Sequence, residues 1–271
     1  MSIVVNTNIG SLNAQRSLAE SSRELATAME RLSSGKKINS AADDAAGFAI
    51  AERMTAQVRG LNMATKNAND GLAMLSTIEN ATNDVTDMLQ RIRELAVQAA
   101  NDTNGGADRG YLQAEVDSLV AEIDRVASNT VYNNKVVLDG SLSGKIQVGT
   151  DSGQTIDFAI NSISSADLAI DALDLSDAAN AATALTALDT AIEQMAGDRA
   201  GYGALANRLE YTVSNLMNVA EFTTAARSRI EDADFAAESA RLAKAQVLQQ
   251  TGTAMLAQAN ASSQLAIQLI R

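Results

Sequence analysis

The chain has 271 residues and a formal net charge of −12, and it contains no Pro, Cys, His or Trp. This charge argues against nucleic-acid or anionic-membrane partners, because both call for a basic surface. The missing His and Cys remove the usual general bases and thiolate ligands. Without proline, and with only 3% aromatic residues, the composition predicts long uninterrupted helices packed closely through small and aliphatic side chains.

The N-terminal segment, MSIVVNTNIGSLNAQ, lacks the basic start, sustained apolar core and cleavage site of a secretory signal peptide. No apolar run approaches the roughly 20 residues that a membrane-spanning helix needs. We therefore expect neither a cleaved signal nor a membrane span.

A heptad-like stripe predicts the first helix. Its steps alternate between four and three residues, at Leu18, Leu25 and Leu32 with Ser22 and Met29 between them. Ser33-Ser34-Gly35 is expected to end it. Asp43 or Asp44 offers an N-cap for the next helix, and Ser40 with Asp43 has capping-box spacing.

Two further helices are predicted next. One runs from about Asp44 to Asn101, with a weak point at Asn69-Asp70-Gly71, because Gly costs about 1 kcal/mol relative to Ala in a helix. Asn104-Gly105-Gly106 is a clear stop. The following helix carries an apolar stripe at Leu112, Val116, Leu119, Ile123 and Val126.

The pattern changes between residues 131 and 175. Alternating residues at 145–148 and 156–160, separated by the turn-like GTDSG, predict a small β-hairpin within about 135–170. A fourth long helix is expected from near Ser176 or Asn180, with a weaker prediction around Gly197, Gly201 and Gly203.

The last helix is predicted from about Asp234 to Arg271. Its seam alternates large and small residues at Leu248, Gly252, Met255, Ala259, Ser262, Ala266 and Leu269. Because both chain ends carry heptad-like seams, we expect them to pair as a coiled coil. Further apolar residues such as Val247 and Leu256 would stay exposed on a single pair, which indicates burial by other copies or partners. The candidate self-assembly residues are Leu18, Leu25, Leu32, Leu248, Met255 and Leu269.

The segment LSSGKKINSAADDAAGFAIAERM at 32–54 allows three interpretations. SSGKK is similar to part of a phosphate loop, but it has one Gly and follows a helix rather than a strand. Asp43-Asp44, like Asp232 and Asp234, are candidate Mg²⁺ ligands. The favoured interpretation is a joint between two helices, formed by Gly35, Lys36, Lys37, Asp43 and Asp44, with the acids capping a helix.

Long motifs in both halves closely resemble bacterial flagellin. In the first half they include NTNIGSLNAQRSL at 6–18, MERLSSGKKINSAADDAAGFAIAERM at 29–54 and LQRIRELAVQAANDTN at 89–104. In the second half they include NRLEYTVSNL at 207–216 and AARSRIEDADFAAESARLAKAQVLQQTGTAMLAQAN at 225–260. The chain departs from the common pattern at Lys36-Lys37 and where many members carry Pro near the C-terminus. About 50 residues separate the matching halves, so the chain resembles a minimal form without variable outer domains.

This resemblance implies a mainly α fold, with long antiparallel helices in a rod-like bundle, a terminal coiled coil and one small β-hairpin region. It implies an inner domain from 1–42 and 232–271 and a helical rod domain at 43–231. The implied function is that of a non-enzymatic flagellar filament subunit for swimming motility, with no cofactor, secreted without signal cleavage. The implied partners are other copies, the type III export apparatus, a chaperone of the C-terminal segment, and cap and hook-associated proteins.

The resemblance also places a contact with the vertebrate Toll-like receptor for flagellin at Arg91, Leu95 and Glu115. Three alternatives to a filament subunit stay open at this point. One is the related hook–filament junction protein, another a carboxylate-dependent metal enzyme, and the third an intracellular helical scaffold.

Overall fold

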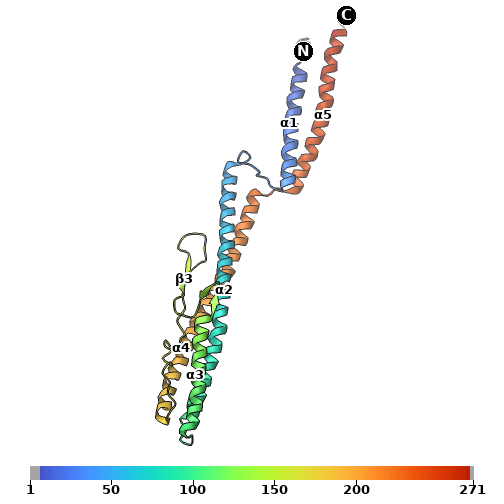
Figure 1. Cartoon of the computed structure of the whole chain (residues 1–271). Helices are drawn as coiled ribbons and strands as arrows, with labels where there is room; N and C mark the ends of the chain where they lie inside the picture. The colour runs from blue at the N-terminus through green and yellow to red at the C-terminus, as the bar shows by residue number, and fades with distance from the viewer. Residues whose placement is uncertain (1–6, 269–271) are drawn as a thin grey trace. The chain divides into compact units, whose positions relative to one another are not determined.

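The fold is mainly α in a computed structural model that describes residues 7–268, with side chains described up to residue 261. The predicted assembly residue Leu269 lies outside these residues. The helices are α1 (Ile9–Ser34), α2 (Ala45–Ala99), α3 (Gly106–Asn129), α4 (Ala178–Glu231) and α5 (Phe235–Gln268) (Figure 1). The strands are β1 (Val131–Tyr132), β2 (Lys135–Val136), β3 (Ser143–Gln147) and β4 (Thr155–Ala159). The predicted fold class is confirmed.

The described residues form two compact units. The terminal unit comprises residues 7–58 and 222–268, and the central unit comprises Arg59–Glu221. The boundaries between the units lie inside α2 and α4. The terminal unit therefore extends further into both helices than the domain expected from the sequence, which ends at 42 and resumes at 232. Within the terminal unit, Lys37 donates its N–H to the carbonyl of Glu231, Ala233 donates to that of Gly35, and Arg227 of α4 donates to Thr55 of α2.

In the terminal unit, α1 and α5 pack side by side and antiparallel (Figure 1). Asn8, which caps α1, donates from Nδ2 to the carbonyl of Ala259 at 2.8 Å. At the other end of α1, Arg31 lies 3.8 Å from Glu238, in the first turn of α5. The predicted pairing of the two chain ends is therefore confirmed.

The seam between α1 and α5 repeats in steps of three and four residues, as in a coiled coil. It comprises Ser11, Ala14, Leu18, Ser21, Leu25, Ala28 and Leu32 of α1, and Glu238, Leu242, Ala245, Gln249, Gly252, Leu256 and Ala259 of α5. The three predicted leucines of α1 lie in it. Ser22 and Met29 were predicted between them and do not: Ser21 and Ala28 occupy those seam positions.

The predicted α5 seam is wrong by one residue at two positions. Leu248 and Met255 are 40% and 63% exposed, and the seam runs through Gln249 and Leu256 instead. Gly252 and Ala259 fit either phase of the repeat, so sequence spacing did not separate them. At Gly252 an added Cβ would lie 3.4 Å from Leu18 Cδ1, so the glycine lets the two helices approach closely.

The central unit has a large apolar core shared by α2, α3, α4 and the connection between α3 and α4, and a smaller cluster of Leu61, Ala64 and Leu216 between α2 and α4. The largest fully buried side chains are Ile78, Leu89, Ile92, Leu95, Ile123, Leu138, Ile163, Ile170, Leu175, Leu188, Met195 and Leu209. Full burial of an aliphatic side chain of this size stabilises by about 1.5–3 kcal/mol. Ile123 belongs to the apolar stripe predicted for α3, whereas Leu138, Ile163, Ile170 and Leu175 lie in the connection between α3 and α4, for which no apolar stripe was predicted.

Two antiparallel hairpins connect α3 to α4. The predicted hairpin is β3 with β4, in a register that places Ile146 opposite Ile156. The other, β1 with β2, was not predicted. Its turn consists of Asn133 and Asn134, both with positive φ, of 48° and 62°. Asn tolerates this conformation, so VYNNKV carried a turn signal that the sequence analysis missed.

The glycines of α2 and α4 interrupt neither helix. At Gly71 an added Cβ would lie 2.6 Å from Ile146 Cδ1, and at Gly60 it would lie 2.8 Å from Thr150 Cγ2. These two glycines therefore let the β3–β4 hairpin approach the backbone of α2. At Gly197, Gly201 and Gly203, no atom of the described residues beyond the adjoining α4 backbone lies within 4 Å of such a Cβ. Near them α4 is held by the buried side chains of Met195, Tyr202 and Leu209.

Candidate functional site

The joint between α1 and α2 begins at a glycine that ends α1. Gly35 has φ of 71°, in the left-handed region, and its N–H donates to the carbonyl of Arg31 at 2.9 Å. This is a glycine C-cap, which a residue with a Cβ adopts only with strain. The SSGKK segment therefore closes a helix here, and it follows no strand, as the phosphate-loop reading would require.

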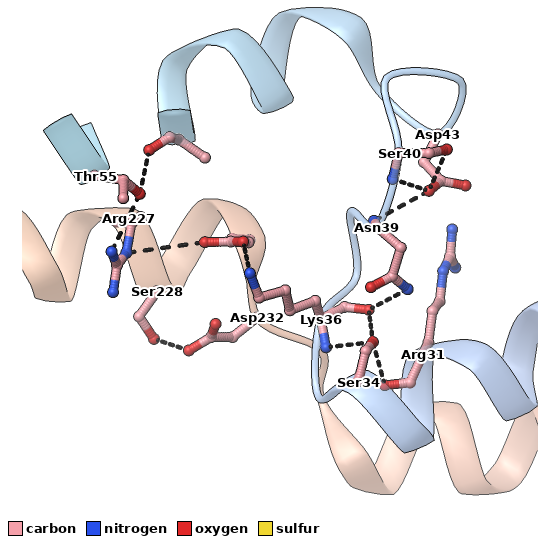
Figure 2. Close-up of polar contacts among 12 residues, drawn as sticks. Arg31, Ser34, Lys36, Asn39, Ser40, Asp43, Thr55, Arg227, Ser228 and Asp232 are labelled. Atoms are coloured by element: carbon pink, nitrogen blue, oxygen red, sulfur yellow. Dashed lines mark hydrogen bonds and ion pairs between the residues drawn. The ribbon is translucent and has the colours of Figure 1, made fainter. Parts of the chain in front are cut away.

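Backbone hydrogen bonds join the two chain segments that cross the joint. The N–H of Lys37 donates to the carbonyl of Glu231 at 2.6 Å, and that of Ala233 donates to the carbonyl of Gly35 at 3.0 Å. Lys36 and Asp232 form an antiparallel bridge between them. Figure 2 shows the two segments side by side. The joint thus includes residues 231–233, which the sequence analysis did not assign to it.

The aspartates of the joint are engaged by backbone N–H groups. Asp44 Oδ1 accepts from Ala46 and Gly47, at 3.1 and 2.9 Å, so Asp44 is the N-cap of α2. Asp234 caps α5 in the same way, accepting from Ala236 at 2.9 Å. These carboxylates satisfy donors that a helix start leaves unpaired.

Asp43 closes the turn before α2 rather than capping the helix (Figure 2). Its Oδ2 accepts from the N–H of Ser40 at 2.9 Å and from that of Asn39 at 3.1 Å. These backbone hydrogen bonds hold the pKa of the Asp43 carboxyl group below its usual value. The predicted Ser40–Asp43 capping box is wrong, because α2 begins at Ala45 and the same contact fixes a turn instead.

Ile38 and Gly47 pack against each other inside the joint, and of these two the sequence analysis did not assign Gly47 to it. Ile38 is the buried residue of the segment, 3% exposed. A Cβ at Gly47 would lie 2.7 Å from Ile38 Cδ1 and 2.5 Å from Asp44 Oδ2. The absence of a side chain at Gly47 therefore lets Ile38 and the capping carboxylate of Asp44 pack against the backbone of α2.

Glu231 is the charged centre of the joint. It pairs with the ammonium of Lys36 and lies 3.8 Å from Nε of Arg227, and its side chain is 16% exposed. Arg227 also donates to Thr55 Oγ1 at 3.2 Å, which ties α4 to α2 within the terminal unit (Figure 2). Lys37 contributes its backbone N–H, while its side chain is exposed.

A second buried carboxylate lies in the seam. Glu238 is 6% exposed, 3.2 Å from Arg241 Nη1 and 3.8 Å from Arg31 Nη1. A charge buried to this extent requires such partners. Glu238 therefore fixes the register of α1 and α5 next to the joint.

The predicted receptor-contact residues lie in the central unit and are not equally accessible. Arg91 donates from Nε and Nη2 to Glu115 Oε1, at 3.0 and 2.9 Å, and from Nη1 to Glu94 at 3.0 Å. These hydrogen bonds raise the pKa of the Arg91 guanidinium. The side chains of Arg91 and Glu115 are half exposed, whereas Leu95 is 1% exposed. The side chain of Leu95 belongs to the core, so in this conformation it is not accessible to a receptor.

Residues 7–268 show no grouping of three or more His, Cys, Asp or Glu side chains placed to hold a metal ion. Across the same residues, no helix has the length and apolar character needed to cross a membrane.

Long paired helices, capped ends and a joint held by backbone bonds define a helical structural subunit. The family model of the bacterial flagellin N-terminal helical region matches residues 5–143, and that of the C-terminal helical region matches residues 185–270. The chain belongs to the bacterial flagellin family, whose members are structural proteins of the extracellular flagellar filament.

Two individual relatives support the same family assignment. The chain is 41% identical over 272 residues to flagellin of Halalkalibacterium halodurans, covering 99% of this chain and 100% of the relative. It is 40% identical over 286 residues to the flagellar filament 33 kDa core protein of Treponema phagedenis, covering 99% and 100%.

Solved structures show the same helical architecture. The crystal structure of Bacillus cereus flagellin is 32% identical with a TM-score of 0.50, covering 56% of this chain and 88% of that one. A putative flagellar hook-associated protein from Vibrio parahaemolyticus has a TM-score of 0.61 over 70% of this chain and 100% of its own. At 15% identity, that likeness concerns the fold alone.

Proposed function

We propose that this chain is the repeating subunit of a bacterial flagellar filament for swimming motility and acts as a building block rather than an enzyme. The observation that carries this function, besides the family, is the surface of the paired chain ends. Leu12, Leu248 and Met255 are 54%, 40% and 63% exposed there. Large apolar side chains that stay exposed on the paired chain ends mark interaction sites. Burial against neighbouring copies accounts for them.

Within such a filament, residues 1–42 and 232–271 form the inner domain and residues 43–231 the outer helical domain. Leu18, Leu25 and Leu32 hold the two ends together within a subunit. Leu248 and Met255, and Leu269 by the spacing of the sequence, contact other copies. The joint at Gly35, Lys36, Lys37, Asp43 and Asp44 sets how the inner helices continue into the outer ones.

The alternative is an adaptor at the junction of hook and filament. The likeness to a hook-associated protein supports only a shared fold. Identities of 40–41% over almost the whole chain, to a flagellin and to a filament core protein, favour the filament subunit.

Secretion and assembly partners follow from the same function. The subunit leaves the cell through the flagellar type III export apparatus without signal cleavage, a chaperone holds its C-terminal segment, and cap and hook-associated proteins receive it. The exposed apolar residues of α5 support a chaperone, because an unassembled subunit would otherwise aggregate through them.

The vertebrate Toll-like receptor for flagellin is a further proposed partner. Arg91 and Glu115 supply an exposed, hydrogen-bonded pair for it, and Leu95 supports that surface from the core. An Arg91→Ala variant is expected to lose most receptor signalling in a reporter-cell assay without losing helix content. Unchanged signalling would contradict this site.

Polymerisation of the purified full-length chain tests the filament function. Monomers at net charge −12 are expected to form long filaments in electron micrographs, more readily as salt screens their repulsion. Deletion of residues 235–271 is expected to abolish filaments while the central unit keeps its helical circular dichroism. Failure of the full chain to polymerise at any salt concentration, with or without filament seeds, would contradict the function. Normal filaments from the deletion would contradict assembly through paired ends.

A further inference from the structure

A groove runs along one side of the α1–α5 pair. Most of its lining positions near the chain ends lie one residue before a seam position, as Ser17 precedes Leu18 and Met255 precedes Leu256, and the others there are seam residues. Near the chain ends the groove has a volume of about 520 Å³ and is lined only by uncharged residues, including Gly10, Ala14 and Gly252, with Leu248 and Met255 also on its wall. Toward the joint, a groove of about 580 Å³ on the same side is lined mostly by charged residues, among them Glu24 and Lys244.

The opposite side of the pair is uncharged along the described helices. We define it by the positions one residue after each seam position, from Leu12 to Ser33 on α1 and from Ser239 to Asn260 on α5. None of these positions carries a charged side chain, although charged residues make up 20% of the chain. Leu12 and Met29 are its large apolar side chains, 54% and 50% exposed. Depletion of charge is typical of the buried part of an interface.

We propose that the uncharged part of the groove binds the uncharged side of a second copy of this chain, with Leu12 of that copy entering beside Leu248 and Met255. This contact rests on the proposed filament function and specifies which surfaces meet. Because the groove and the uncharged side lie on opposite sides of one helix pair, each copy offers one of each. Such a heterologous contact leaves both ends of a dimer open and can continue without limit.

The distribution of charge selects Leu12 over Met29. Leu12 lies within the terminal half of α1, level with the uncharged part of the groove. Met29 lies next to Arg31, level with the charged part. Covering that part with an uncharged face would take charges out of water without giving them partners, which is unfavourable. The contact is therefore confined to the half of the pair that is distant from the joint.

The missing cysteines make this contact directly testable, because engineered thiols are then the only ones. Leu12→Cys and Ser17→Cys variants are polymerised separately and as a mixture, and each filament is treated with a short bis-maleimide. Covalent dimers on denaturing gels are expected in the mixture and at least tenfold less in either variant alone. A mixture of Met29→Cys and Ser17→Cys is the matched control and is expected to give at least tenfold fewer dimers.

Three results would overturn the contact while leaving the filament function intact. They are dimers in Leu12→Cys filaments alone, equal dimers in the control mixture, and no dimers in the test mixture. As a second measurement, Leu12→Glu is expected to raise the critical concentration for polymerisation at least tenfold with unchanged monomer helicity, whereas Leu12→Met leaves it within twofold. Normal assembly of Leu12→Glu would also overturn the contact. Failure of the unsubstituted chain to polymerise would contradict the filament function itself, and this contact with it.

Discussion

Replacing Gly71 by Ala tests whether the hairpin is seated on α2 by a glycine. Ala favours a helix interior by about 1 kcal/mol relative to Gly. The new Cβ would lie 2.6 Å from Ile146 Cδ1 and 3.4 Å from Leu209 Cδ1. Overpacking of this kind costs about 1–3 kcal/mol. We expect the monomer to lose about 1 kcal/mol of unfolding free energy, although helix propensity alone predicts a gain.

Ile146→Val gives the matched background. It removes the clashing Cδ1 and leaves Cγ1, at 3.6 Å, an ordinary contact distance. Alone it should cost about 1 kcal/mol, as usual for this truncation. Once the space is open, Gly71→Ala should stabilise by about 1 kcal/mol. The effect of the same substitution thus changes sign, with a coupling energy of about 2 kcal/mol.

Urea unfolding of the four monomeric proteins, followed by far-UV circular dichroism, measures this cycle. Gly197→Ala is the control, because in the part of the chain that the structure describes nothing beyond the adjoining α4 backbone lies within 4 Å of a Cβ at that position. It should stabilise by about 1 kcal/mol in both backgrounds. Gly71→Ala could instead behave like Gly197→Ala and stabilise the protein equally with Ile or Val at position 146. That result would refute the close packing of the hairpin against Gly71.

Three further predictions concern the caps, pH and a buried hydroxyl. Gly35→Ala should destabilise the terminal unit by about 1 kcal/mol in thermal unfolding, and Gly35→Asn by less, since Asn tolerates positive φ; equal stability would contradict the cap. Backbone hydrogen bonds lower the pKa of the Asp43 carboxyl group in the folded state. The stability that these bonds contribute is complete above about pH 3.8 and is lost as pH falls through the lower folded-state pKa. An NMR titration that puts the folded-state pKa of Asp43 above 3.8 would refute this prediction. Tyr202→Phe removes the acceptor of the Asn161 N–H, 3.2 Å away, and should cost about 1 kcal/mol, whereas Tyr211→Phe, at a 79% exposed site, should cost nothing measurable by urea unfolding.

The helices and their apolar stripes were predictable because each stripe repeats over many turns. Absence of proline removed the commonest interruption, so α2 and α4 continue through their glycines. What the sequence did not distinguish was the role of those glycines. Gly71 packs against Ile146 of the hairpin, whereas Gly197 packs against no other element of the described residues. In the sequence, however, both glycines predict the same local weakening of a helix. Only contacts between residues distant in the chain separate the two cases.

The seam of α5 shows the same limit of prediction from local sequence. Leu248 and Met255 form one heptad-spaced pair, and Leu242, Gln249 and Leu256 form another, one residue later. Small residues at 252 and 259 suit both phases, so the choice depends on which face meets Leu18. Similarly, the acids of the joint were placed correctly near helix starts. The backbone bonds to residues 231–233 carry no side-chain signature, so the second half of the joint was missed.

The hydrogen bond from Asn8 to Ala259 joins residues 251 positions apart, so the chain ends pair only after almost the whole polypeptide is available. Closing a flexible loop of that length costs entropy before any contact is gained. Folding of the central unit, which brings Leu61 against Leu216, leaves roughly 100 flexible residues in the loop and lowers this cost by about 1 kcal/mol. We therefore expect the middle of the chain to fold first and its two ends to pair last, so that the proposed contact surfaces form only once the subunit is complete.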